Sequence, residues 1–160
     1  MDMIFDIDGT LLDISHRLHL IRKKPPDWKT FKDPNLARWD VPRLAIIKVA
    51  VALQIAGNQV ILCSGRRESE REDTLKSLSR FFKSDVDKIL HGISRIQMPL
   101  LCMRKDKDYR PDTEVKADML ETLRNQGFNP VMAFDDRPSV IRMWKEHGLT
   151  VADVGNGVEF

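Results

Sequence analysis

Short, almost wholly apolar runs alternate with helical patterns along this chain, and that alternation constrains its fold more than any other feature. Each run has four or five residues, and none shows the alternation of apolar and polar residues that is typical of a half-exposed strand. Strands buried on both faces belong to parallel sheets that helices cover on both sides. The sequence therefore predicts an α/β fold with a central parallel sheet, whose strands lie near residues 3–6, 59–63, 99–103, 131–134 and 150–154.

Helices are expected between these strands, where apolar residues recur at helical spacing. In the segment 42–56 the apolar residues follow this spacing, and Gly57 provides a stop. The segment 112–126 has an acidic start, which suits a helix N-terminus, and Gly127 follows it. The expected helices span residues 42–56, 70–82, 112–126 and 139–147, with a shorter one at 14–21.

Length and composition indicate one ordinary globular domain. A chain of 160 residues can bury a substantial core, and 42% apolar and 31% charged residues are typical of such domains. The formal net charge of +2 neither indicates nucleic-acid binding nor opposes an anionic substrate. Whether an anion binds therefore depends on the local distribution of charge. Cys63 and Cys102 lie in apolar runs and are interpreted as reduced core residues.

The start of the chain and the length of its apolar runs indicate where in the cell the protein is expected. Met1 leads almost directly into the first expected strand, which leaves no room for a signal peptide. The longest apolar stretches are far too short to cross a bilayer. We therefore expect a cytoplasmic protein without a membrane partner, located in the host cytoplasm if its source is a virus.

Polar residues follow three of the expected strands, in the segments 6–10 (DIDGT), 64–66 (SGR) and 135–137 (DDR). In open α/β folds the ligand crevice lies beyond the carboxyl ends of the strands, so these segments should converge. One or two acids at such places are helix N-caps, which is our interpretation of Asp13 and Asp112. Four aspartates at two strand ends repel one another and need a cation. Their hard oxygen ligands suit Mg²⁺.

The polar motifs, taken in order, resemble those of phosphatases of the haloacid dehalogenase (HAD) superfamily. That superfamily has Asp-x-Asp-Gly-Thr after its first strand, a Ser or Thr that closes a later strand, a Lys near a later helix, and a pair of acids after another strand. The resemblance implies a three-layer Rossmann-like HAD fold with a small or minimal cap. The matching residues are the segment 6–10, Ser64, Lys116, and the pair Asp135 and Asp136.

The resemblance also implies catalytic roles. Asp6 is the expected nucleophile, which attacks phosphorus and forms an aspartyl-phosphate that water then hydrolyses. Asp8 is expected to protonate the leaving oxygen and then to activate the hydrolytic water. Ser64 and Lys116 are expected to hold the phosphoryl oxygens, where charge builds up.

The implied cofactor is Mg²⁺, held by the Asp6 carboxylate, the Asp8 backbone carbonyl and Asp135. Asp136 is expected close by, or to act through water. A basic stretch at 103–112 follows the third expected strand at the ligand edge, and its position favours substrate contact over a merely solvated face. The expected substrate-binding residues are Gly9, Thr10, Arg66, Arg104 and Arg110.

A closer resemblance is to the 3′-phosphatase domain of phage polynucleotide kinase–phosphatase. The shared features are the DxDGT start, a strand that ends in SGR, and a DDR followed by a helix with an apolar-x-x-Trp pattern. The resemblance covers nearly the whole chain but is loose between residues 13 and 42. That enzyme also has a P-loop kinase domain, and no GxxxxGK[ST] pattern occurs here. We therefore expect a single phosphatase domain over residues 1–160 and no kinase domain.

Residues 13–42 form a long connection, and connections of this length are usually functional or flexible. Between residues 13 and 33 it holds six basic residues against three acids, interleaved with Trp28 and Phe31. Such a segment suits a nucleotide or a single-stranded end, through phosphate contacts and base stacking. A small cap whose aromatic residues pack inward fits equally well. The insertion at about 13–42 is thus predicted to be a substrate loop or a cap.

The leading functional hypothesis is a Mg²⁺-dependent phosphomonoesterase that removes 3′-phosphates from nucleic-acid ends. A nucleoside monophosphate phosphatase, a 5′ or 3′ nucleotidase, is the alternative and needs only a small closed pocket. A non-catalytic nucleic-acid-binding protein of the same fold belongs to another class, and intact Asp6 and Asp8 argue against it. The expected partner is a phosphorylated nucleic-acid end or a nucleotide, with no obligate protein partner.

Overall fold

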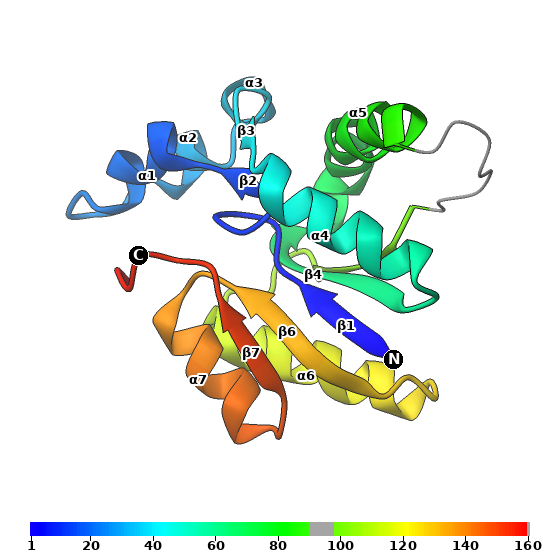
Figure 1. Cartoon of the computed structure of the whole chain (residues 1–160). Coiled ribbons are helices and arrows are strands. Elements are labelled where there is room, and N and C mark those ends of the chain that lie inside the picture. Colours follow the sequence, from blue (N-terminus) through cyan, green and yellow to red (C-terminus); the bar gives the residue numbers. More distant parts are fainter. Residues whose placement is uncertain (90–97, 160) are drawn as a thin grey trace.

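Five parallel strands form the central sheet in a computed structural model that describes residues 1–89 and 98–159 (Figure 1). The strands are β1 (Asp2–Phe5), β4 (Gln59–Arg67), β5 (Leu100–Arg104), β6 (Pro130–Asp135) and β7 (Thr150–Asp153). Their order in space is β5-β4-β1-β6-β7, and every neighbouring pair is parallel. The strand order therefore reverses between β1 and β6, and open α/β sheets bind their ligands at such a point.

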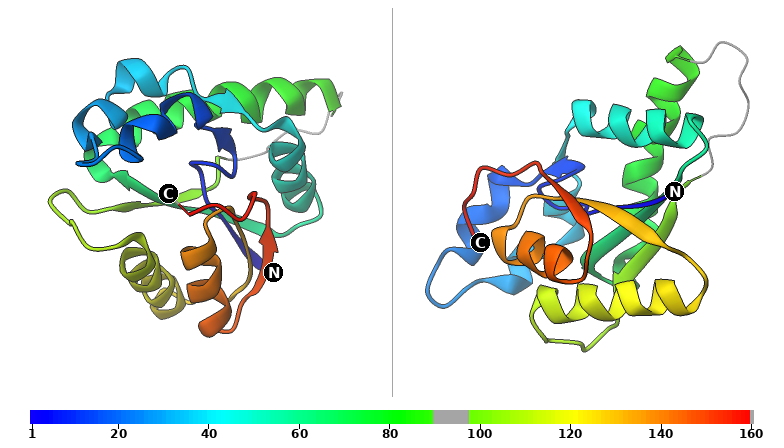
Figure 2. Two further views of the ribbon diagram at one scale, coloured as in Figure 1. Left: turned by 90° about the vertical axis from the view of Figure 1, so that its left-hand side faces the viewer. Right: turned by 60° about the horizontal axis from the view of Figure 1, so that its bottom comes forward.

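Two layers of helices cover the sheet, one on each face (Figure 1, Figure 2). The long helices are α4 (Leu44–Ile55), α5 (Arg71–Ile89), α6 (Asp112–Asn125) and α7 (Pro138–Glu146). Two neighbouring residues of β1 point to opposite faces of the sheet and pack in different layers. Phe5, on one face, is buried in a cluster with Ile47 of α4. Ile4, on the other face, is buried in a second cluster with Leu120 of α6 and Trp144 of α7. The predicted three-layer parallel α/β fold is confirmed.

The ends of some elements differ from the prediction: α5 ends at Ile89 rather than at residue 82, and β4 ends at Arg67 rather than at residue 63. Ser64 pairs with Met103 of β5, and pairing then resumes between Arg67 and Arg104 after a shift in register. Irregular pairing of this kind redirects side chains near a strand end. The irregularity brings the SGR segment to the ligand edge of the sheet while it still belongs to a strand.

The insertion at 13–42 forms a small lobe beside the ligand edge. It contains α1 (Ser15–Ile21), α2 (Trp28–Phe31) and α3 (Pro34–Ala37), and it is closed by the antiparallel pair β2 (Leu12–Asp13) and β3 (Val41–Pro42). The helix expected at 14–21 is confirmed. Helices α2 and α3 were not predicted, although the Asp27 and Asp33 carboxylates cap them by accepting hydrogen bonds from main-chain N–H groups. A small cluster of Ile14, Leu20 and Phe31 holds the lobe together.

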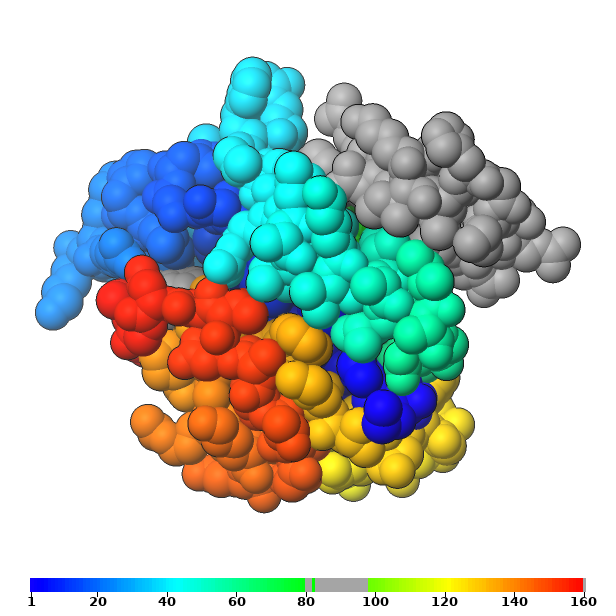
Figure 3. Space-filling view, in the orientation of Figure 1, coloured from blue at the N-terminus to red at the C-terminus, as the bar shows by residue number. Residues whose placement is uncertain are grey.

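Arg43, where the lobe rejoins the domain, connects three distant parts of the chain. Its guanidinium donates to the carbonyl of Gly9 and, at 2.8 Å, to that of Val154. In the space-filling view the lobe, in blue, borders the C-terminal residues, in red (Figure 3). The first strand's loop, the lobe and the C-terminal segment thus meet at one end of the sheet.

Two smaller expectations can be compared with the structure. Cys63 and Cys102 are free thiols and face each other as register partners on β4 and β5. Among the described residues, none of the helices has the length and apolar character needed to cross a bilayer.

Candidate active site

Acidic and basic side chains meet at the carboxyl ends of β1 and β6, where the strand order reverses. Asp6 follows β1 directly, Asp135 is the last residue of β6, and Asp136 comes next. Lys116 reaches the same place from the first turns of α6. All four residues are buried, and the sequence predicted each of them for this site.

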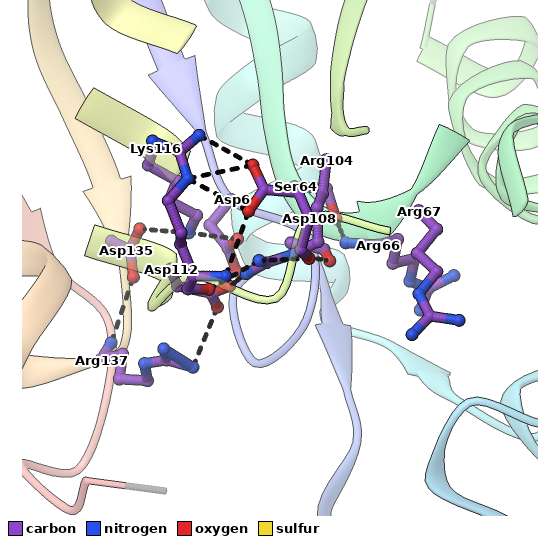
Figure 4. A network of polar contacts seen from close by, with 12 residues as sticks. Asp6, Ser64, Arg66, Arg67, Arg104, Asp108, Asp112, Lys116, Asp135 and Arg137 are labelled. Carbon is purple, nitrogen blue, oxygen red and sulfur yellow. Dashed lines mark hydrogen bonds and ion pairs between the residues drawn. The ribbon is translucent and has the colours of Figure 1, made fainter. Parts of the chain in front are cut away.

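Lys116 binds two of the carboxylates (Figure 4). Its ammonium lies 2.6 Å from Asp6 Oδ1 and 2.9 Å from Asp135 Oδ2. Asp135 is held further by the indole N–H of Trp144, at 3.1 Å, and by the main-chain N–H of Arg137. Although burial alone lowers the pKa of Lys116, the charges of Asp135 and Asp6 outweigh it and raise that pKa. Lys116 is therefore a permanent cation at the base of the site.

The three carboxylates of Asp6, Asp135 and Asp136 form a compact cluster, with one oxygen from each within 4.8 Å of the others. Burial raises the pKa of Asp6, and the neighbouring carboxylates add to that rise while Lys116 opposes it. Burial and the charge of Asp135 raise the pKa of Asp136 to about 6. One ammonium against three carboxylates leaves negative charge that a divalent cation can balance. The hard oxygen donors fit Mg²⁺.

Asp8 points away from this cluster, toward two arginines. Arg66 Nη2 lies 2.6 Å from Asp8 Oδ1, and Arg17 Nη2 lies 2.7 Å from the same oxygen. Burial alone raises the pKa of Asp8, but the charges and hydrogen bonds of Arg66 and Arg17 outweigh it and lower that pKa to about 2. The Asp8 carboxylate thus lies outside the three-carboxylate cluster and is held ionised.

The lobe takes part in the site through Asp40, which binds the same two arginines. Asp40 Oδ2 lies 2.7 Å from Arg17 Nη2 and 2.8 Å from Arg66 Nη2, and Asp40 is buried. His16 lies 3.0 Å from the other Asp40 oxygen. This chain of contacts fixes the lobe to the catalytic loop through charged groups.

Gly9, Thr10 and Ser64, all predicted site residues, lie at the same edge. Gly9 has φ +93°, and a Cβ there would come within 2.0 Å of an Asp136 carboxylate oxygen. The Thr10 hydroxyl donates to Asp136 at 3.4 Å. Ser64 is fully buried, and its Oγ accepts a hydrogen bond from the Arg66 N–H. The loop after β1 therefore needs glycine because its backbone passes against the acid pair.

Arg104 and Arg110, both predicted to bind substrate, bind protein groups in the structure. Arg104 is buried, and its guanidinium donates to the carbonyls of Gly65, Asp108 and Arg110 and to the Asp112 carboxylate. Arg110 pairs with Asp108 and with Asp118 of α6. Substrate contact by either arginine stays a prediction and requires the exchange of one of these bonds.

The interpretation of Asp112 as a helix N-cap is wrong. Pro111 occupies the cap position of α6 without a side-chain hydrogen bond. The Asp112 carboxylate instead binds Arg104 and, at 3.0 Å, Arg137. Burial raises the pKa of Asp112, but the charges of Arg137, Lys116 and Arg104 lower it overall. Asp112 therefore joins the two arginines that border the catalytic cluster.

A pocket of about 590 Å³ opens above these groups, which is a size typical of small-ligand sites. The three-carboxylate cluster and Lys116 lie at its base. Trp28 and Phe31 of the lobe also line it, as does Tyr109 of the loop between β5 and α6. Phe31 packs inward with the lobe cluster, whereas Trp28 is 49% exposed. Phe31 therefore fits the predicted cap whose aromatic residues pack inward, and Trp28 fits the predicted substrate loop.

Sequence reasoning missed Arg17 and Asp40 as site residues. Arg17 was counted only as one of six basic residues in a segment suited to a nucleotide or a strand end, but it is almost fully buried. The available signal was its place in α1, one turn before Leu20 on the buried face. Asp40 carries no comparable signal, because a single acid in an irregular segment has no periodicity that indicates burial.

Comparison with known proteins gives one family match, over residues 1–159, to the family described as the polynucleotide kinase PNKP phosphatase domain. Among solved structures, a chain in the structure of the Pnkp1/Rnl/Hen1 RNA repair complex is similar at 27% identity and a TM-score of 0.68. That match covers 98% of this chain but only 42% of the other, so the chain spans less than half of that relative's length.

Two other solved structures share the fold at 14% identity. One is D,D-heptose 1,7-bisphosphate phosphatase from B. bronchiseptica, complexed with magnesium and phosphate, with a TM-score of 0.55 over 98% of this chain and 83% of that one. The other is a class C acid phosphatase from Bacillus anthracis with tungstate bound, with a TM-score of 0.57 over 97% of this chain and 66% of that one.

Proposed function

Because the chain belongs to the family of polynucleotide kinase PNKP phosphatase domains, we propose that it removes 3′-phosphates from nucleic-acid ends. Phosphatase activity is common to the family. What we propose for this chain is the position of the phosphate, at the 3′ end, and the substrate, a nucleic acid. We further propose that residues 1–160 act as one phosphatase domain, with residues 13–42 as its substrate lobe.

The observation that carries this proposal is the position of Asp6. Its carboxylate is buried at the end of β1, faces the pocket and lies 2.6 Å from the Lys116 ammonium. A phosphoryl group in the pocket would meet a carboxylate nucleophile backed by a permanent cation. The carboxylate oxygen forms a bond to phosphorus while the bond from phosphorus to the sugar oxygen breaks.

The remaining steps fall to neighbouring groups. Asp8 gives a proton to the departing sugar oxygen and then takes one from the water that attacks the aspartyl-phosphate. That second attack releases inorganic phosphate and restores the Asp6 carboxylate. Lys116 and Ser64 hold the phosphoryl oxygens through both displacements.

Asp8 must gain a proton before it can give one, yet Arg66 and Arg17 keep its pKa near 2 in the free protein. An incoming phosphate offers these arginines a competing anion, and guanidinium groups bind phosphate in the same forked geometry as carboxylate. If Arg66 moves to the phosphate, the larger of the two charges that depress the pKa of Asp8 moves away, and that of Arg17 remains. We propose that substrate binding thereby prepares Asp8 as the acid.

Mg²⁺ is the proposed cofactor, since Asp6, Asp135 and Asp136 supply clustered hard oxygens and leave negative charge unbalanced. When bound, it neutralises the phosphoryl oxygens and the nucleophile, which otherwise repel each other. Of this chain's residues, Asp135 and Asp136 would hold it beside Asp6, together with the predicted Asp8 carbonyl.

The test of this function is phosphate release from a set of substrates. It uses 3′-phosphorylated oligonucleotides, 5′-phosphorylated oligonucleotides and free mononucleotides, each with and without Mg²⁺. We expect the 3′-phosphorylated oligonucleotide to give the highest kcat/KM. Its advantage over a 3′-mononucleotide should shrink as salt rises, because additional phosphate contacts are sensitive to salt.

Equal kcat/KM for mononucleotides and oligonucleotides at every salt concentration would reject the polynucleotide substrate. The nucleotidase alternative would then replace it, with residues 13–42 as a lid over a small pocket. A preference for 5′-phosphorylated ends would reject the 3′ assignment alone. Nucleic-acid binding without any turnover would favour the non-catalytic alternative.

A second prediction concerns Asp8. We expect Asp8→Asn to lower kcat/KM for a 3′-phosphorylated oligonucleotide by roughly 10² to 10⁴, the usual contribution of a general acid. With p-nitrophenyl phosphate the loss should be much smaller, because that leaving group departs without a proton. Steady-state assays of both substrates measure the difference. Equal losses on the two substrates would mean that Asp8 serves to anchor Arg66 and Arg17 and is not the acid.

A further inference from the structure

Most of the cations that line the pocket are bound to carboxylates of the protein. Arg17 and Arg66 pair with Asp8 and Asp40, and Lys116 pairs with the catalytic acids. The other arginines of the pocket, apart from Arg67, also have carboxylate partners: Arg104, Arg110 and Arg137.

Arg67 and Lys32 differ from these cations. Both line the pocket, and neither has a carboxylate ion-pair partner among the residues that the structure describes. The Nε atom of Arg67 is buried and has no hydrogen-bond partner within the described part of the chain. Glu70 is close, but its carboxylate accepts a hydrogen bond at 2.6 Å from the main-chain N–H of Arg67.

The two cations also act on each other. Burial lowers the pKa of Lys32 and the charge of Arg67 lowers it further, while the charge of Glu70 acts in the opposite direction without cancelling them. Arg67 comes from the end of β4 and Lys32 from the end of α2, so two separate elements bring like charges together. Figure 4 shows the Arg67 side chain directed away from the group around Asp6 and Lys116. An anion between the two cations would relieve their repulsion at a place separate from the catalytic base of the pocket.

Each of these cations lies over an aromatic ring. The Arg67 guanidinium carbon is 5.6 Å from the centroid of the Tyr109 ring, and Lys32 Nζ is 5.6 Å from that of Trp28. Tyr109 is 78% exposed and Trp28 is 49% exposed, although both line the pocket. Exposed aromatic faces next to unpaired cations are the features with which proteins bind single-stranded nucleic acid.

We propose that Arg67 and Lys32 form a second anion subsite, which binds the 5′-phosphoryl group of the nucleotide whose 3′-phosphate is removed. Tyr109 and Trp28 offer their rings to the base of that nucleotide. This inference rests on the proposed function and extends it, because it states how the pocket distinguishes a strand end from a 3′-mononucleotide. The 5′-phosphoryl group is a phosphodiester in a strand and a phosphomonoester in a nucleoside 3′,5′-bisphosphate.

Four substrates test the subsite: p-nitrophenyl phosphate, adenosine 3′-monophosphate, adenosine 3′,5′-bisphosphate and a 3′-phosphorylated trinucleotide. The wild-type chain should prefer the last two over the monophosphate. In Arg67→Gln and Lys32→Ala the ratio of kcat/KM between the bisphosphate and the monophosphate should fall about tenfold, as for loss of a charge-assisted hydrogen bond. Arg142→Ala, an exposed arginine on α7, is the matched control and should leave that ratio unchanged.

The results test the proposed phosphatase function and the anion subsite separately. No phosphate release from any of the four substrates by the wild-type chain would reject the proposed function itself. Turnover without a preference for the bisphosphate, or with a preference that neither variant changes, would overturn the subsite and leave the phosphatase intact. Equal sensitivity of trinucleotide and bisphosphate to Arg67→Gln supports the subsite for strands. Sensitivity of the bisphosphate alone supports an anion subsite for free nucleotides and rejects the strand assignment.

Discussion

Asp6→Asn is expected to abolish turnover while leaving the fold intact. The amide is nearly the same size as the carboxylate but cannot form the aspartyl-phosphate. We therefore expect kcat to fall on the order of 10⁴-fold or more, which corresponds to about 5 kcal/mol of barrier. Single-turnover and steady-state phosphate release from a 3′-phosphorylated oligonucleotide measure the loss. The effect should be equally large with p-nitrophenyl phosphate, since the nucleophile is needed for every substrate.

The fold should tolerate this change because Asp6 lies in a crowded acidic cluster. Its substitution removes the ion pair with Lys116, but it also removes the repulsion from Asp135 and Asp136. Lys116 keeps its contact with Asp135. Thermal unfolding without metal should therefore stay within a few degrees of wild type, and Glu121→Gln on the exposed side of α6 provides a matched surface control. Activity of Asp6→Asn within about tenfold of wild type would reject Asp6 as the nucleophile.

The sheet and the acidic cluster were predictable because both follow from local patterns. A buried strand has to be apolar, so the runs that hold Ile4, Leu62 and Ala133 identify strands without any knowledge of their partners. The carboxyl ends of parallel strands share one edge, which placed Asp6 beside Asp135 although they are far apart in the chain. Lys116 depended on the resemblance alone, since a lysine early in a helix is normally a surface residue.

The charged chain that connects the lobe to the site was not predictable, because it depends on tertiary contacts. Asp40 pairs with Arg17 and Arg66, and Arg17 pairs with Asp40 and Asp8, so each would be costly to bury alone. A sequence shows the types of these residues but not which opposite charge will accompany them. The same limit explains Asp112, whose position at the start of a helix suggested a cap. Its partners come from the end of β5 (Arg104) and from the residue before α7 (Arg137).

Strict dependence on a hard divalent cation is the second large effect that we expect. Asp6, Asp135 and Asp136 place oxygens within 4.8 Å of one another, and the Lys116 ammonium balances only part of their charge. Exhaustive treatment with EDTA should reduce phosphate release to background, and Mg²⁺ should restore it. Binding can also be measured without turnover, because a ligand at roughly 100 times its Kd adds about 2.7 kcal/mol to the free energy of unfolding. The melting temperature should therefore rise by several degrees with Mg²⁺.

The two acids after β6 should differ in this assay, because their surroundings differ. Asp135 is oriented by Lys116, by the Trp144 indole and by the Arg137 N–H, so its oxygens are fixed before a cation arrives. The single side-chain donor found for Asp136 in the described part of the chain is Thr10, at 3.4 Å. A preorganised ligand contributes more to affinity, so Asp135→Asn should raise the Mg²⁺ concentration for half-maximal stabilisation further than Asp136→Asn does. Full activity after EDTA treatment, or an unchanged melting temperature with Mg²⁺, would mean that these acids do not form a metal site and that Lys116 alone balances the nucleophile.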